Sequence, residues 1–83
     1  MTREEIQQDL LKMVGDHLNV PQESIDDAST MKGLGADSLD MVEIIMHIEE
    51  KFNINIDDAD VEKVETFEQL TDIVTKKIGE GTK

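Results

Sequence analysis

The residues best suited to chemistry in this chain are Asp37, Ser38 and Asp40, within the run Gly-Leu-Gly-Ala-Asp-Ser-Leu-Asp-Met-Val-Glu at positions 33–43. Aspartate is a strong helix N-cap, and a second aspartate three residues later completes a capping pattern. This arrangement leaves Ser38 in the first turn, where free backbone N–H groups and the helix macrodipole stabilise an anion. The pattern therefore predicts that the Ser38 hydroxyl accepts a phosphorylated group.

A catalytic role for Ser38 is disfavoured, because a nucleophilic serine needs a general base that is oriented by a third group. The chain has two histidines, His17 and His47, and neither stands in a recognisable triad pattern. We interpret both histidines as structural or neutral. Ser38 is then an acceptor on which another enzyme acts, and the protein is a carrier rather than an enzyme.

Apolar residues at helical intervals predict the elements that position Ser38. They indicate three main helices, over residues 2–18, 37–52 and 66–78, and one short helix over residues 58–63. The expected capping residues are Thr2 with Glu5, Asp37 with Asp40 and Thr66 with Gln69 at helix starts, and Asn19, Asn53 and Gly79 at helix ends. The predicted fold is all-α: a small four-helix bundle in one domain over residues 1–83, with residues 79–83 fraying.

The connections between the helices carry signals of their own. The loop over residues 19–36 is long for a small domain, and long loops are often functional. It contains Ile25, Met31 and Leu34, which we expect to anchor it in the core. Ile54 and Ile56 alternate with asparagine as in a strand, but no partner strand is evident, so we predict an extended linker.

The second predicted helix has two apolar faces. An α-helix turns by roughly 100° per residue. On this basis one group of apolar residues falls within an arc of roughly 100° around the helix, which suits a face that packs against the core. Its members are Met41, Ile44, Ile45, Ile48 and Phe52. A separate apolar stripe is formed by Leu39, Val42 and Met46, with Glu43, Glu49 and Glu50 beside it. One alternative is that the loop over residues 19–36 covers this stripe, and another is that a few exposed apolar residues carry no function, since such residues are common on protein surfaces. We favour the interpretation that the stripe is an exposed recognition surface rimmed by carboxylates.

Charge and composition narrow the classes of partner. Twenty acidic residues against eight basic ones give a net charge of −12, which repels nucleic acid and anionic membranes and attracts basic protein surfaces. Eleven of the acidic residues lie between positions 37 and 68. There is no cysteine, so any thiol chemistry must come from a prosthetic group. Since no signal peptide or membrane span is evident, we expect the protein to be cytoplasmic. We also expect it to be a monomer.

Two other binding functions fit the sequence poorly. An EF-hand loop starting at Asn53 would place Asp58 and Val64 where glycine and glutamate are required, so we predict no specific metal site. Loose cation binding by the acidic clusters would still relieve self-repulsion. Gly33 and Gly35 resemble part of a nucleotide-binding loop, but no strand precedes them and Ser38 replaces the third glycine.

The run at positions 33–43 closely resembles the modification site of acyl carrier proteins of the dissociated fatty-acid synthase type. The resemblance extends from about Ile6 to Ile78, and Gly-Ala-Asp-Ser-Leu-Asp is its most specific part. It implies that a phosphopantetheinyl transferase attaches 4′-phosphopantetheine from coenzyme A to Ser38. The thiol of that arm would hold acyl chains as thioesters, which can fold back into the apolar bundle and pass between acyl-processing enzymes.

The resemblance also implies that the second helix is the recognition element for partner enzymes with basic patches. The expected recognition residues are Asp37, Leu39, Asp40, Val42, Glu43, Met46, Glu49 and Glu50. Two positions depart from the family pattern: Lys32 stands where acidic residues are common, and Asp57 where proline is common. A specialised carrier for polyketide, lipid A or another acyl pathway therefore stays open beside fatty acid biosynthesis. An unmodified acidic interaction module is the alternative from another class.

Overall fold

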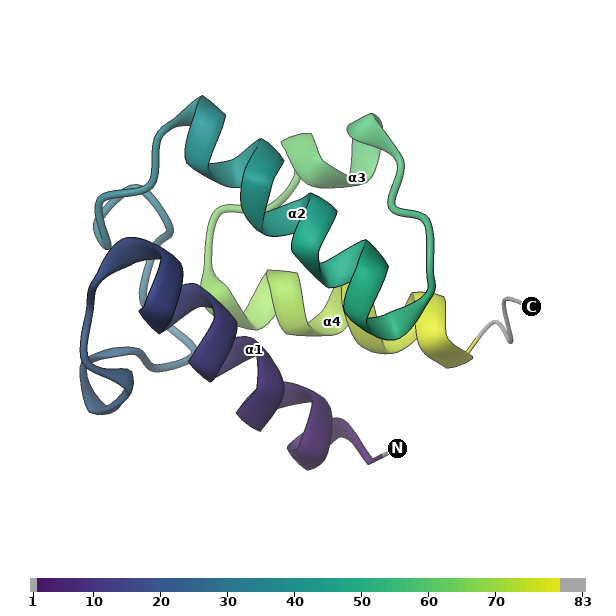
Figure 1. The fold of residues 1–83 in the computed structure, drawn as a ribbon, viewed down its shortest axis with the longest axis horizontal. Helices are drawn as coiled ribbons and strands as arrows, with labels where there is room; N and C mark the ends of the chain where they lie inside the picture. The colour runs from purple at the N-terminus through teal and green to yellow at the C-terminus, as the bar shows by residue number, and fades with distance from the viewer. Residues whose placement is uncertain (1, 80–83) are drawn as a thin grey trace.

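Four α-helices and one 3-10 turn make up the protein in the computed structural model, which describes residues 2–79 (Figure 1). In chain order they are α1 (Arg3–Leu18), the 3-10 turn η1 (Gln22–Ser24), α2 (Ser38–Phe52), α3 (Asp58–Glu62) and α4 (Phe67–Gly79). Extended pairing within residues 2–79 is limited to an isolated bridge between Thr30 and Thr66. The prediction of an all-α bundle with three main helices and one short one is confirmed.

The helices begin where the capping residues were predicted. At α1, Thr2 accepts a hydrogen bond from the Glu5 backbone N–H at 3.1 Å, and the Glu5 side chain accepts one from the Thr2 N–H at 2.9 Å. Thr66 and Gln69 make the same reciprocal pair at the start of α4, at 3.2 and 2.9 Å. These side chains satisfy backbone donors that a helix start leaves free, so they determine where each helix begins.

The C-terminal ends of α1 and α2 are closed by asparagines in the left-handed conformation. Asn19 has φ 62° and Asn53 has φ 56°, and each N–H reaches back to a carbonyl four residues earlier. Asparagine adopts this conformation more readily than most residues, which explains its place at both ends. Gly79 is a small correction: it is helical and is the last described residue, because glycine can also adopt helical angles at a terminal turn. Residues 80–83 of the expected frayed tail lie outside the described part of the chain.

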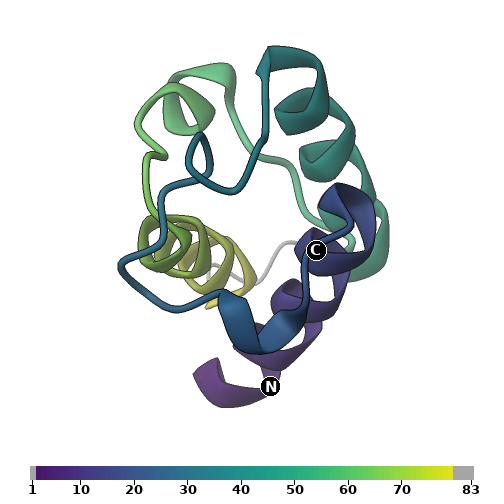
Figure 2. The same cartoon turned by 90° about the vertical axis from the view of Figure 1, so that its left-hand side faces the viewer.

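The core lies between the three long helices. In Figures 1 and 2, α1 lies beside α2 and α4, and these pairs pack together. The connections contribute side chains as well, since Ile25 and Met31 are buried and Leu34 packs half-buried at the edge. The buried apolar residues are Ile6, Leu10, Val14, Ile25, Met31, Ile44, Ile45, Ile48, Ile54, Ile56, Phe67, Leu70 and Val74.

The long connection before α2 is tied to the start of α4. The Met31 N–H donates to the Glu65 carbonyl at 2.9 Å, and the Phe67 N–H donates to the Ser29 carbonyl at 2.8 Å. Gly35, with φ 99°, then turns the chain into α2, a conformation that favours glycine. These bonds hold the entry to α2 in a defined place although the segment is mostly irregular.

The segment between α2 and α3 is extended, as predicted, and both Ile54 and Ile56 point into the core. Its backbone is held by Glu49, whose carboxylate accepts a hydrogen bond from the Ile56 N–H at 2.8 Å. No helix within residues 2–79 combines the length and the apolar character needed to cross a membrane.

Candidate functional site

Ser38 is the first residue of α2 and is exposed. The preceding Asp37 caps the helix: its Oδ1 accepts from the Asp40 N–H at 2.8 Å, and its own N–H donates to Asp40 Oδ2 at 3.2 Å. Because Asp37 supplies the cap, the Ser38 hydroxyl makes no hydrogen bond within the described residues 2–79. The hydroxyl is therefore available to an external reactant at the positive end of a helix.

The capping box also sets the charge beside Ser38. The Asp37 N–H that donates to the Asp40 carboxylate holds the pKa of Asp40 below its usual value, and contact with His17 acts in the same direction. Asp40 is thus a carboxylate at neutral pH. Both aspartates of the box contribute negative charge around the exposed serine.

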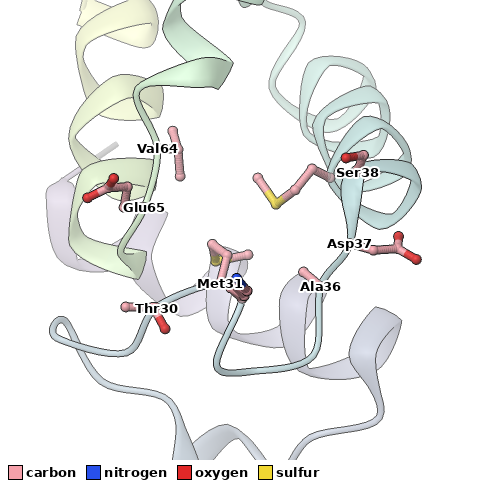
Figure 3. Close-up of a pocket in the computed structure, with 9 residues that line it drawn as sticks. Thr30, Met31, Ala36, Asp37, Ser38, Val64 and Glu65 are labelled. Atoms are coloured by element: carbon pink, nitrogen blue, oxygen red, sulfur yellow. The ribbon is translucent and has the colours of Figure 1, made fainter.

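A cavity of about 620 Å³ opens beside Ser38 (Figure 3). One wall is Met31 from the long connection, another is Met41 from α2, and Val64 lies opposite on the segment that precedes α4. In Figure 3, Val64 and Met31 lie across the opening from Ser38. The remaining lining residues are Thr30, Lys32, Ala36, Asp37 and Glu65. The size and the largely apolar walls suit an alkyl chain.

The cavity contains residues that sequence reasoning assigned to other roles or passed over. Met31 and Met41 were expected to be core residues, and Val64 was not singled out. Each of the three has an ordinary apolar identity. The available signal was indirect: a core of Ile, Leu, Val and Met with two phenylalanines repacks readily.

The buried face of α2 matches the predicted arc. Ile44, Ile45 and Ile48 are buried, while Met41 and Phe52 are half-buried and pack against the core. The predicted core face of this helix is therefore confirmed.

The second apolar stripe of α2 faces outward. Leu39, Val42 and Met46 are 66%, 53% and 54% exposed, and they are the large hydrophobic residues exposed in this way among residues 2–79. The long loop over residues 19–36 does not cover them, so the alternative in which that loop buries the stripe is wrong. Exposed apolar side chains grouped on one helix face are typical of an interaction surface.

The acidic residues around this stripe divide into two groups. Glu50 is exposed, whereas Glu49 is half-buried and holds the linker through Ile56. Asp40 and Glu43 face α1, where each has a carboxylate oxygen 3.3 Å from His17 Nε2. The sequence placed all four on the recognition rim, and it indicated neither the contacts of Asp40 and Glu43 with His17 nor the bond from Glu49 to the linker.

Comparisons with known proteins agree with this geometry. A profile of the family described as "Phosphopantetheine attachment site" matches residues 8–74. The acyl carrier protein of Buchnera aphidicola subsp. Acyrthosiphon pisum is 44% identical over 73 residues, which cover 87% of this chain and 91% of that relative. The acyl carrier protein of Thermotoga maritima is 35% identical over 79 residues, covering 94% and 98%.

Solved structures show the same fold. The crystal structure of the Thermotoga maritima acyl carrier protein superposes with a TM-score of 0.83 at 30% identity and covers 96% of this chain and 94% of that one. A structure of the acyl carrier protein from Enterococcus faecalis superposes with a TM-score of 0.80 at 32% identity, with coverage of 93% and 99%. These chains are matched along nearly their whole length.

Proposed function

The chain belongs to the acyl carrier protein family, and we propose that Ser38 is the residue that carries its 4′-phosphopantetheine. Members of this family are carriers and do not catalyse reactions, and fatty acid biosynthesis is their usual role. The observation that carries the assignment is the exposed Ser38 hydroxyl, which lacks a partner within residues 2–79 and stands at a helix start capped by its neighbour Asp37.

The protein's own groups prepare Ser38 for an anionic substituent. The first-turn N–H groups and the macrodipole of α2 stabilise a phosphodiester on the serine oxygen. Asp37 fixes the helix start, so the oxygen stays at the mouth of the cavity. When attached, this group supplies a thiol that holds an acyl chain as a thioester. The thiol must come from the attached group, because the chain itself contains no cysteine.

The cavity beside Ser38 supports the proposal that the acyl chain folds back against the bundle. Met31, Met41 and Val64 present apolar surface to it, and methionine side chains adapt to occupants of different length. Burial would remove the alkyl chain from water, with roughly 0.8 kcal/mol gained per buried methylene.

We further propose that the exposed face of α2 is where partner enzymes dock. Leu39, Val42 and Met46 form the apolar centre, and a rim of carboxylates would steer basic patches toward it. The proposed rim consists of Asp37, Asp40, Glu43, Glu49 and Glu50. The proposed partners are a phosphopantetheinyl transferase and acyl-processing enzymes, which the chain meets as a monomer in the cytoplasm.

The attachment site is tested by incubating the unmodified protein with a phosphopantetheinyl transferase and coenzyme A, followed by intact-mass analysis. We expect one added phosphopantetheine in the native chain and none in Ser38→Ala, which should fold normally because the serine makes no side-chain bond within residues 2–79. Ser24→Ala and Ser29→Ala serve as controls and should be modified like the native chain. Modification that persists in Ser38→Ala would contradict the assignment.

The docking surface is tested by Glu43→Lys, which reverses one charge of the rim. We expect slower association with the transferase at low salt and a smaller difference at high salt, because screening weakens steering. Glu62→Lys on α3 makes the same charge change away from α2 and is the matched control. Equal effects of both variants would show that net charge, and no particular surface, governs docking.

Lys32 is a specific observation in favour of a specialised pathway, since it lines the cavity where an acyl group would lie. We propose fatty acid biosynthesis as the pathway, in line with the usual role of the family. The mass of the acyl group on protein isolated from its native source distinguishes the two.

A further inference from the structure

The two histidines of this chain meet at one place, on the side where α1 contacts α2. His17 lies in the last turn of α1, and His47 lies on α2. Their ring centroids are 6.2 Å apart, and the rings meet edge to face at 68°. Glu43 lies one turn and Asp40 two turns before His47 along the same helix, so α2 presents two carboxylates and an imidazole towards the end of α1.

The distances around His17 fit a shared cation. His17 Nε2 lies 3.3 Å from Asp40 Oδ1 and 3.3 Å from Glu43 Oε1. A strong charge-assisted hydrogen bond would be shorter, about 2.7–2.9 Å. Two ligands of a tetrahedral zinc ion are separated by roughly 3.4 Å, given bonds of about 2.0–2.2 Å. Within residues 2–79, the ligand atoms of these three residues form the one group that lies close enough to hold a metal, within 4.8 Å of one another.

The arrangement also supplies the outer contacts that a metal ligand needs. Asp40 Oδ2 is occupied by the Asp37 N–H at 3.2 Å, which turns Oδ1 towards His17. Carboxylate ligands of metals are commonly oriented in this way by a second hydrogen bond. The side chain of His17 is 21% exposed, so its ring is largely held by its surroundings.

A small cavity gives a metal ion access to His17. It has a volume of about 290 Å³ and is lined by His17, His47, Asp16, Met13 and Ile44. Because His47 lines the same cavity as His17 and stands four residues after Glu43 on α2, a change of its side-chain rotamer would bring a fourth donor to the group.

We propose that His17, Asp40 and Glu43, with His47 as the fourth ligand, form a zinc site that joins α1 to α2. Imidazole nitrogen combined with carboxylate oxygen is a donor set that suits zinc, whereas calcium and magnesium prefer six or more oxygen ligands. The sequence predicted loose cation binding by the acidic clusters and no specific metal site, because no acidic segment fits an EF-hand loop. This inference does not depend on the modification of Ser38.

The test is a calorimetric titration of zinc chloride into the full-length protein after removal of metals with a chelator. We expect one zinc ion per chain, retained in excess magnesium. His17→Gln, His47→Gln and Glu43→Gln should each weaken binding by about tenfold or more, since even second-shell changes cost about 10–100-fold. Glu50→Gln removes one carboxylate from α2 away from His17 and should bind zinc like the native chain.

Circular dichroism checks that each variant is folded. Should one of the three variants unfold, the other two still test whether the site binds zinc. Cobalt provides a second readout, because imidazole–carboxylate ligation in a tetrahedral site produces visible absorption that His17→Gln should abolish. Zinc binding of equal strength in native protein, His17→Gln and Glu43→Gln would overturn the proposal, as would complete displacement of zinc by magnesium. In either case the cluster would be an ion pair between helices, surrounded by loosely held counterions.

Discussion

The two apolar faces of α2 contain similar residues and have opposite surroundings. Ile44 and Ile48 are 2% and 0% exposed, whereas Val42 and Met46 are more than half exposed on the same helix. α1 packs against α2, and the side chains of α1, α4 and the linker after α2 complete the core around the first face. The comparison teaches that apolar residues of one helix stabilise the fold where neighbours cover them, and that those left uncovered are available for the recognition proposed above.

The largest effect is expected on the buried face. Ile48→Ala removes a fully buried side chain and leaves a cavity, so it should lower the free energy of unfolding by about 2–5 kcal/mol. This is a large share of the stability of a small domain. Chemical denaturation followed by circular dichroism measures it, and a loss well under 1 kcal/mol would mean that this face is not the core.

An intermediate loss of stability is expected for changes at the N-terminal end of α2, where both faces of the helix begin. Asp37→Ala removes the side chain that accepts from the Asp40 N–H, and loss of such a cap costs about 0.5–2 kcal/mol. Asp37→Asn retains the capping oxygen and should restore most of the stability. Should both variants melt like the native chain, the capping box would contribute nothing to the positioning of Ser38.

A smaller effect on stability is expected on the exposed face. Met46→Ala and Val42→Ala should change the free energy of unfolding by no more than about 0.5 kcal/mol, as is typical of surface substitutions. The same variants should weaken binding to the transferase, because the apolar centre of the proposed interface is lost. Thermal melts paired with partner titrations separate the two effects. A loss of stability from Met46→Ala equal to that from Ile48→Ala would remove the distinction between the faces.

The smallest effect concerns the charge that accompanies the exposed face. With a net charge of −12 on 83 residues, repulsion among carboxylates should destabilise the folded state at low ionic strength. Raising salt from a very low to a moderate concentration should therefore raise the melting temperature by a few degrees. The interaction of Ile48 with the core should not respond to salt, so native protein and Ile48→Ala should shift alike. A melting temperature independent of salt would count against this reasoning.

Local signals in the sequence were sufficient for most of the architecture. Thr2, Asp37 and Thr66 cap helices because a side-chain oxygen next to a helix start satisfies backbone donors within a few residues. The same short-range logic predicted the open hydroxyl of Ser38 and the two faces of α2, since a period of about 3.6 residues assigns every position to a face. Helix caps and helix faces depend on residues that are close together along the chain, and the sequence specifies these residues directly.

Contacts between distant segments could be read only from the folded chain. His17 meets Asp40 across 23 positions. Val64 lines the cavity beside Ser38, and the Glu49 carboxylate accepts a hydrogen bond from the Ile56 N–H. Each of these depends on the angle and separation at which helices and connections pack, which many side chains determine jointly. Residue types and spacing therefore predicted the helices, their caps and the exposed serine that we propose for attachment, whereas helix packing decided which carboxylates stay free and which side chains line a cavity.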